Sequence, residues 1–332
     1  MIISRTPFRI SYVGGGSDLP IYYRKSGGAV LSCTINKYLY VNSHDFFDTG
    51  KIQTKYSRTE TVSSVAEIEH PLLRAILTRL RMSTGLEISS VADIPAGTGM
   101  GSSSSFTVGT LHNLMARLGL ADKATKAWLA EQACAVELGD LSEPIGKQDQ
   151  YAAAYGGFNI YRFNPDETVS IEPVVLPDPE GWRAHLRMYY LGNQRSASSI
   201  LAEQSRETKK RSKKDILDTM VGLVDPFAIA LGQSDWLECG RLMHENWKLK
   251  QSLASGISDV YIKDIYQRGL IAGALGGKLL GAGGGGFILF VVRPEDHAKL
   301  DISLSHLRPF TFNWDFEGSS IIYSDEAPGS KR

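Results

Sequence analysis

The sequence has few cysteines, no long hydrophobic run and no excess of charge of either sign. Its three cysteines, Cys33, Cys134 and Cys239, lie far apart and form no CxxC pair. This argues against a disulfide framework or a zinc site and indicates reduced thiols in a cytoplasmic protein. No segment approaches the roughly 18 apolar residues of a membrane span, and the N-terminus lacks the basic and apolar regions of a signal peptide. We therefore expect a cytoplasmic protein without a membrane partner.

The charge balance also excludes a class of partner. The chain carries 36 basic and 36 acidic side chains, which cancel. A protein that binds nucleic acid needs an excess of Lys and Arg on one face, so we expect none and predict a small-molecule substrate. The basic run at residues 209–214 follows two glutamates and is interpreted as a solvated helix face. The sequence contains no signal for oligomeric state.

The length of 332 residues is enough for about two domains, and 42% of the residues are hydrophobic. Strand-like and helical segments are mixed without regular βαβ alternation, which predicts an α+β fold with two domains. Residues 173–181 contain three prolines and a glycine. We therefore place the domain boundary there, with one domain at residues 1–176 and the other at residues 182–328.

Glycine is abundant, with 33 residues, and it is clustered. The central loop, residues 95–105 (PAGTGMGSSSS), lies between a predicted strand and a predicted helix. Glycines let an anion approach the backbone, and a helix start offers unpaired N–H groups. The alternative is a tight turn with serine caps. We interpret the loop as a phosphate site of a nucleotide, formed by Pro95, Gly97, Gly99, Met100, Gly101, Ser102, Ser103 and Ser104.

Other glycine motifs do not fit nucleotide folds. Each Gly-Lys pair lacks the Ser or Thr that must follow in a Walker A loop. Residues 281–286 (GAGGGG) match GxGxxG, but they precede a predicted strand instead of a helix, which is the wrong context for a dinucleotide fold. We interpret this segment as a flexible backbone hairpin beside a ligand, with Gly283 and Gly284 in contact with substrate.

Two further segments carry charged residues beside glycines. Near the N-terminus, Arg9 precedes Gly14-Gly15-Gly16-Ser17-Asp18, and Asp149 lies in the first turn of a predicted helix. The helix dipole favours the ionised form of a first-turn carboxylate. Taken alone, Arg9 and Asp18 are better explained as surface salt-bridge partners, and the alternative for Asp149 is simply a good first-turn residue.

Together, the three segments resemble the motifs of the GHMP kinase superfamily. The central loop resembles PxxxGLGSSA, residues 281–286 the third motif and residues 6–18 the first. The resemblance covers essentially the whole chain. It implies a two-domain α+β architecture, with an N-terminal domain like ribosomal protein S5 domain 2 and a C-terminal ferredoxin-like domain. It also implies ATP as co-substrate, Mg²⁺, and an active site between the domains.

Within the superfamily, the chain resembles bacterial kinases of D-glycero-D-manno-heptose 7-phosphate, which phosphorylate the anomeric oxygen. Residues 5–10, 14–18, 146–157 and 195–204 carry this likeness. It implies formation of the 1,7-bisphosphate, for nucleotide-activated heptose and surface polysaccharide. Fucokinase-type sugar kinases share several of these fragments and remain an alternative. Galactokinases have Glu-His where this chain has Gly15-Gly16, which speaks against galactose.

The resemblance also implies roles for single residues. Asp149 is the expected base or orienter of the sugar hydroxyl, with Arg9 beside it, and Asp18 is the expected acceptor of a sugar hydroxyl. Ser103, or one of its neighbours, and Glu137 are the expected Mg²⁺ ligands. The chain departs from the family at Met100, where Leu is usual, and at Ser105, where a small apolar residue is common. The expected sugar contacts also include Gly15, Gly16 and Ser17.

A phosphorylated sugar needs a second anion site. Arg195 and Ser196, with Ser198 and Ser199 at a predicted helix start, are the candidates, and a surface arginine with capping serines is an equal alternative. Adenine is expected between residues 51 and 72. Two other functions stay open: a non-catalytic nucleotide or sugar sensor, which would be expected to lose Asp149 and Glu137, and a decarboxylase relative acting on mevalonate diphosphate.

Overall fold

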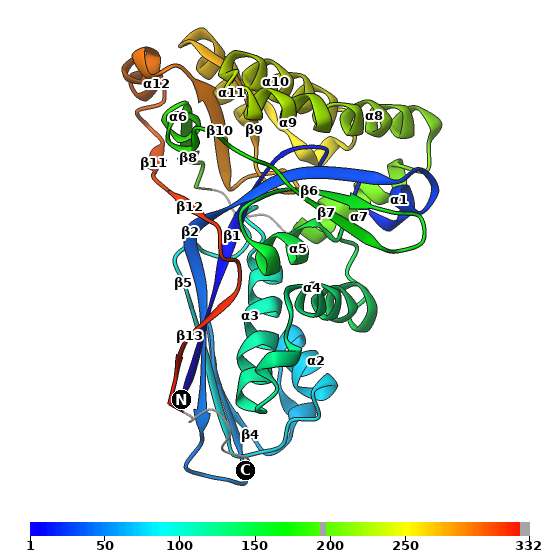
Figure 1. The fold of residues 1–332 in the computed structure, drawn as a ribbon, viewed down its shortest axis with the longest axis vertical. Coiled ribbons are helices and arrows are strands. Elements are labelled where there is room, and N and C mark those ends of the chain that lie inside the picture. The colour runs from blue at the N-terminus through cyan, green and yellow to red at the C-terminus, as the bar shows by residue number, and fades with distance from the viewer. Residues whose placement is uncertain (193–196, 326–332) are drawn as a thin grey trace.

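The computed structural model describes residues 1–192 and 197–325, which form two β-sheets with helices packed against them (Figure 1). The strands are β1 (Ile2–Val13), β2 (Gly28–Asp45), β3 (Ile52–Lys55), β4 (Thr59–Val62), β5 (Leu86–Ala92), β6 (Phe158–Phe163), β7 (Val169–Pro173), β8 (Leu186–Tyr190), β9 (Ala274–Leu279), β10 (Phe287–Val292), β11 (Arg308–Phe310), β12 (Trp314–Asp315) and β13 (Ser320–Ser324). The α-helices are α1 (Pro20–Ser26), α2 (Pro71–Arg79), α3 (Ser102–Arg117), α4 (Lys126–Cys134), α5 (Gln148–Tyr155), α6 (Pro179–Ala184), α7 (Ala197–Glu207), α8 (Arg211–Gly222), α9 (Val224–Gly232), α10 (Trp236–Gln251), α11 (Val260–Ile271) and α12 (His297–Ser303).

The first sheet is built on the long strands β1 and β2. Its strands run in the order β13-β1-β2-β5-β3-β4, and β2 also pairs with β6 and β12. All pairs are antiparallel except β3 with β5. β1 alternates at its start and is then buried throughout residues 6–13, where α3 and α10 pack against it. A functional side chain on this part of β1 is therefore held rigidly.

Helix α3 fills the centre of this half. Leu111, Leu114 and Met115 are buried, as their helical spacing predicts, whereas Leu118 just beyond the helix is 42% exposed. The helix starts at the serines of the central loop. Its first turn therefore lies at the end of the sheet that faces the C-terminal half (Figure 1).

The segment predicted as one helix at residues 123–138 has a different form. A 3₁₀ turn (Ala121–Lys123) precedes α4, and α4 runs into a π-helical segment, Ala135–Asp140. A π segment adds a residue to the turn and re-aims the side chains that follow, and such segments are frequent at functional sites. Glu137 lies on this segment.

The second sheet has the order β11-β8-β10-β9 and is antiparallel. All six residues of β10 are buried, which explains its uninterrupted hydrophobic sequence. Helices α10 and α11 pack on β9, and α12 packs against α11. The 3₁₀ turns Val65–Glu67, Ser255–Ile257 and Pro294–Asp296 complete the regular elements.

The chain returns to the first sheet at its C-terminal end. β12 pairs with β2 and β13 pairs with β1, so residues 314–324 complete the sheet of the N-terminal half. The division at residues 173–181 therefore separates the two sheets along most of the chain, while this last segment of the predicted second domain belongs spatially with the first sheet.

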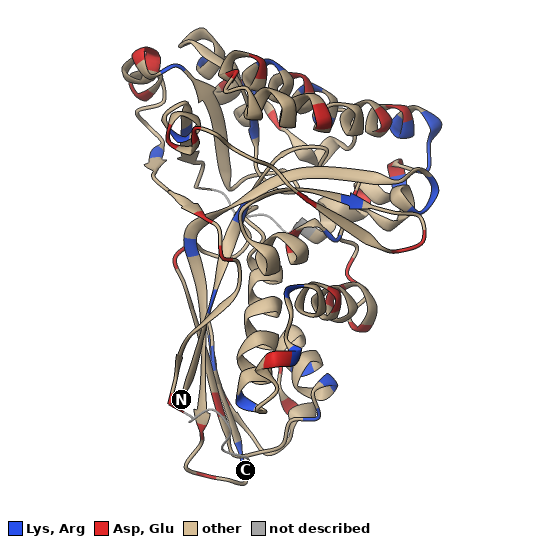
Figure 2. Ribbon diagram, viewed as in Figure 1, with Lys and Arg blue, Asp and Glu red and all other residues tan. Residues whose placement is uncertain are grey.

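Side chains of both charge signs are interspersed over both halves (Figure 2). In the described ranges, 1–192 and 197–325, no helix has the length and apolar character needed to cross a membrane.

Candidate active site

A cavity of about 650 Å³ lies where the central loop, the N-terminal strand and the C-terminal half meet. Arg9, Asp18, Asp149 and the loop glycines and serines all contribute to its wall. The structure therefore brings together residues that are up to 140 positions apart in the sequence. Other lining residues are Tyr56, Ser57, His70 and Leu72, which fall near or within the segment expected to hold adenine.

The central loop presents its backbone to this cavity. Gly97, Gly99 and Gly101 adopt φ values of 76°, 80° and 78°, which favour glycine. Gly101 caps α3 without a side-chain hydrogen bond, which leaves the first N–H groups of the helix available to an anion. Gly97, Gly99, Gly101, Ser102, Ser103 and Ser104 line the cavity. Pro95 and Met100 are not among its lining residues, and Met100 is fully buried in the core.

The second glycine loop packs directly on the first. A Cβ atom on Gly281 would lie 2.5 Å from the Cα atom of Gly99, and one on Gly286 would clash with the carbonyl of Thr98. Gly281 and Ala282 line the cavity. Gly283 and Gly284, expected at the substrate, instead pack against Ile257, whose carbonyl accepts a hydrogen bond from the Gly284 N–H at 3.1 Å.

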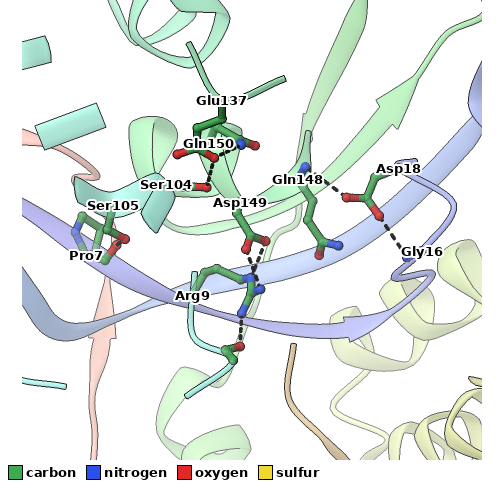
Figure 3. A network of polar contacts seen from close by, with 11 residues as sticks. Pro7, Arg9, Gly16, Asp18, Ser104, Ser105, Glu137, Gln148, Asp149 and Gln150 are labelled. Carbon is green, nitrogen blue, oxygen red and sulfur yellow. Dashed lines mark hydrogen bonds and ion pairs between the residues drawn. The ribbon is translucent and has the colours of Figure 1, made fainter. Parts of the chain in front are cut away.

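Arg9 and Asp149 form a two-pronged ion pair at the centre of the site (Figure 3). Nε and Nη2 of Arg9 donate to the two carboxylate oxygens, each at 2.7 Å, and Nη1 donates to the Gly99 carbonyl at 2.6 Å. Arg9 is 4% exposed, while the Asp149 side chain is 24% exposed. This pair fixes the orientation of the carboxylate and also ties it to the glycine loop.

Asp18 is the second carboxylate of the cavity. It accepts hydrogen bonds from the backbone N–H groups of Gly16 (2.9 Å) and Gln148 (3.3 Å), the latter at the start of α5. Burial, and then the charge of Asp149, raise the pKa of Asp18. Gly146 packs so closely on this carboxylate that a Cβ atom there would clash with it.

The other residues expected to contact the sugar differ in where they lie. Gly16 lines the cavity, whereas Gly15 and Ser17 are not among its lining residues. The Ser17 hydroxyl donates to the carbonyl of Ala29 at 2.9 Å and so fixes the loop. Arg195 and Ser196 lie outside the described residues. Ser198 lines the cavity and donates to Glu143 at 2.8 Å.

Glu137 lies behind the start of α3. It accepts hydrogen bonds from Ser104 (2.9 Å), Thr107 (2.6 Å) and Gln150 (2.5 Å), and burial raises its pKa to about 7. Ser104, instead of Ser103, is the serine that touches it (Figure 3). Within the described residues no group of three His, Cys, Asp or Glu side chains could hold a metal by itself. A carboxylate and a hydroxyl are ligands that suit Mg²⁺. Ser104 lines the cavity, whereas Glu137 is 1% exposed and is not among the lining residues.

Lys250 is a cavity residue that the sequence motifs do not reveal. It comes from α10, is 4% exposed, and donates to the Gly15 carbonyl at 3.2 Å. Burial lowers its pKa to about 8. In the sequence, only the spacing of Asn246 and Lys250, one helical turn apart, indicates that these two polar side chains share a helix face. No glycine motif lies beside them.

Known proteins resemble this chain in both halves. Residues 54–157 match the N-terminal domain of the GHMP kinases, and residues 227–303 match their C-terminal domain. The D-glycero-alpha-D-manno-heptose 7-phosphate kinase of Campylobacter jejuni is 27% identical over 96% of this chain and 98% of that protein. An L-fucokinase/L-fucose-1-P guanylyltransferase of Bacteroides fragilis is 28% identical over 90% of this chain and 35% of its own length.

The fold has solved counterparts. The crystal structure of a D-glycero-D-manno-heptose 1-phosphate kinase from Bacteroides thetaiotaomicron superposes with a TM-score of 0.74 and is 25% identical, covering 98% of this chain and all of that one. A mevalonate kinase structure, 20% identical with a TM-score of 0.73, shows the same fold. The predicted two-domain α+β architecture is confirmed.

Proposed function

This chain belongs to the GHMP kinases and is an ATP-dependent sugar kinase, and we propose that it phosphorylates the anomeric hydroxyl of D-glycero-α-D-manno-heptose 7-phosphate, giving the 1,7-bisphosphate. The observation that carries the proposal is the Arg9–Asp149 pair, which shares one cavity with Asp18 and with the serine-tipped start of α3. The full-length likeness to a heptose 7-phosphate kinase supports the choice of acceptor.

Phosphoryl transfer requires mainly positioning and charge neutralisation from the protein. In the proposed mechanism the amides of residues 97–104 and the start of α3 bind the phosphates of ATP. Asp149, held by Arg9, orients the C1 hydroxyl and accepts its proton as the bond to phosphorus forms. Asp18 accepts hydrogen bonds from other hydroxyls of the sugar. Mg²⁺ held by Glu137 and Ser104 would neutralise phosphate charge.

The proposed roles fit the geometry around Asp149. A Cβ atom on Gly101 would lie 3.3 Å from an Asp149 carboxylate oxygen, so the carboxylate is directly beside the start of α3. Gly101 and Asp149 both line the cavity, so a phosphate and an acceptor hydroxyl bound in it would be close to each other. An acceptor hydroxyl bound at Asp149 would then lie beside a nucleotide bound on the loop, which supports the proposal.

An acceptor screen tests the proposal. ATP consumption is measured with heptose 7-phosphate, mannose 6-phosphate, L-fucose, galactose and mevalonate, and the phosphorylated carbon is identified by NMR. We expect the highest kcat/KM with heptose 7-phosphate and phosphate at C1. A higher kcat/KM with L-fucose would replace this acceptor by the fucokinase alternative, and turnover of none of the sugars would overturn the proposal.

The 7-phosphate requires a second cationic contact, for which we propose Arg195. Replacing Arg195 by Ala is then expected to raise the KM for the phosphorylated sugar at least tenfold and to leave the KM for ATP within twofold. An equal change in both constants would exclude this role. Replacing Arg211 by Ala, at the exposed start of α8, is the matched control.

A further inference from the structure

Helix α10 carries a buried lysine into the cavity from the C-terminal half. Lys250 lines the cavity together with Arg9, Asp18 and Asp149, all of which come from the N-terminal half. An ammonium group has three N–H donors. The described residues supply one acceptor for them, the Gly15 carbonyl at 3.2 Å. Lys250 lines the cavity, so an oxygen of a ligand bound there would be in a position to accept from the remaining donors.

The same face of α10 holds the glycine loop in a second way. Asn246, one turn before Lys250, accepts a hydrogen bond from the Gly14 N–H at 3.0 Å. Both side chains are buried. Asn246 is not among the residues that line the cavity. Loop anchoring and ligand contact are therefore separable on this helix: both residues anchor the loop, and Lys250 in addition reaches the cavity.

The charges around Lys250 come from four groups. Asp18 and Asp149 attract its ammonium group. The positive charge of Arg9 repels it, and Lys250 in turn repels the ammonium group of Lys278. Lys278, on β9, is buried and donates to the Tyr12 carbonyl at 2.9 Å. Two carboxylates thus share one buried region with three basic side chains. Arg9 and Lys250 line the cavity, whereas Lys278 does not. Arg9 is already held in its two-pronged ion pair with Asp149, and Lys250 has no such pair.

We propose that Lys250 is an acceptor-binding residue: its ammonium group offsets the charge of Asp18 and donates a hydrogen bond to an oxygen of the bound sugar. This rests on the kinase activity proposed above, but not on heptose 7-phosphate being the acceptor. Lys250 then acts from the C-terminal half on a sugar whose proposed contacts with Asp149 and Asp18 come from the N-terminal half.

Steady-state kinetics of three variants test this role, using whichever acceptor has the highest kcat/KM in the screen. We expect Lys250→Met to raise the KM for the acceptor at least tenfold and to leave the KM for ATP within twofold. Asn246→Ala removes only loop anchoring. The factor by which it raises the acceptor KM is therefore expected to be at least fivefold smaller than the factor for Lys250→Met. Lys248→Met, on the exposed face of the same helix, controls for loss of charge and is expected to match wild type.

The pH profile separates a binding charge from a structural one. Because burial lowers the pKa of Lys250 to about 8, the ammonium form is present below pH 8 and is lost above it. Wild-type kcat/KM for the acceptor is therefore expected to fall as the pH rises through about 8, and Lys250→Met is expected to lack this fall.

Several results would overturn the assignment. These are an acceptor KM of Lys250→Met within twofold of wild type, equal rises in Lys250→Met and Asn246→Ala, or a fall above pH 8 that persists in Lys250→Met. If Lys250→Met does not fold, Lys250→Arg keeps a charge that does not titrate in the accessible pH range, and the proposal then requires the alkaline fall to be absent from this variant. A failed acceptor screen would instead contradict the proposed function.

Discussion

Both carboxylate oxygens of Asp149 accept hydrogen bonds from the guanidinium group of Arg9, which also donates to the carbonyl of Gly99. The position of the carboxylate is thus set by a side chain that is itself 4% exposed on a rigid strand. Such support keeps a reacting group within the narrow geometry that proton transfer requires.

Replacing Asp149 by Asn tests this residue directly. The amide keeps the shape but cannot take up a proton, so we expect kcat to fall by roughly 10²–10⁴ while ATP still binds. Single-turnover kinetics and nucleotide titration measure the two effects. Asp140→Asn, which alters a surface ion pair with Arg79, is the matched control. Unchanged turnover in Asp149→Asn would remove Asp149 from the mechanism.

His112 gives a pH dependence of stability that is independent of catalysis. It lies on α3 beside Ser319, with Nδ1 3.0 Å from the hydroxyl, and burial lowers its pKa to about 4. Between pH 6.5 and 4 the unfolded chain binds a proton that the folded chain does not, so the free energy of unfolding falls as the pH is lowered through this window.

In His112→Asn this contribution is absent. Relative to wild type, we expect the variant to gain on the order of 2 kcal/mol in free energy of unfolding between pH 7 and pH 4.5. Urea unfolding at the two pH values measures the change, with His306→Asn, at an exposed position, as control. A constant difference between variant and wild type would contradict the assignment.

Single residues differ in how far the sequence reveals them. Arg9, Asp18 and Asp149 stand beside glycines in recognisable spacings, and the structure brings all three to one cavity. Lys250 lies beside no recognisable motif. Its place in the cavity depends on how α10 packs against the loop after β1, and the sequence does not reveal this packing. The sequence does not distinguish Ser104 from the two serines before it. In the structure, Ser104 is the one that donates a hydrogen bond to Glu137.

At the scale of elements, the site depends on two glycine loops in direct contact. Gly99 and Gly281 leave no space for a side chain between them, so the start of α3 and the hairpin before β10 approach at backbone distance. Each loop on its own can be predicted from its composition. Their contact cannot, since it arises from the packing of two sheets that the sequence separates by about 180 residues.

Gly99→Ala is expected to push the two loops apart. A Cβ atom there would clash with the carbonyl of Leu280, in addition to the backbone strain at φ 80°. We expect kcat/KM for ATP to fall at least tenfold. Gly119→Ala is the matched control, because Gly119 has a φ of 70° with no atom within 4 Å of the added Cβ. It shares the strain, so equal kinetic losses in both variants would contradict the role of the loop contact.

Element boundaries show a similar limit. The helix at α5 follows from its sequence, since a proline and a glycine precede it and two glycines end it. The π-helical segment that carries Glu137 does not, because its extra residue per turn is stabilised by the tertiary hydrogen bonds that Glu137 receives from α3 and α5. Periodicity alone predicts a regular helix there.

At the scale of the whole molecule, the first and last described strands, β1 and β13, pair in one sheet. Trp314 on β12 is buried against Phe158, with ring centroids 4.9 Å apart, and its indole N–H donates to the Pro179 carbonyl at 2.9 Å. It joins the returning segment, the first sheet and the start of α6. A division of the sequence into two consecutive domains could not predict this return, because short strands such as β12 carry little pattern of their own.

Trp314→Ala is expected to destabilise the whole protein by about 3–5 kcal/mol, the usual loss for a large buried aromatic side chain. Because the C-terminal segment is part of the first sheet, unfolding is expected to remain a single transition by calorimetry. Phe316→Ala, 59% exposed on the same segment, is expected to have a small effect. Two separate transitions in the wild-type protein would show that the halves unfold independently.

The facing pair of Gly99 and Gly281 also constrains recombination between relatives. Neither position can compensate for a larger residue at the other, because each already has the smallest side chain available. A chimera that takes one loop from a parent with a bulkier residue there would lose the close fit, however similar the rest of its sequence. Crossover designs should therefore transfer residues 97–101 and 281–286 together.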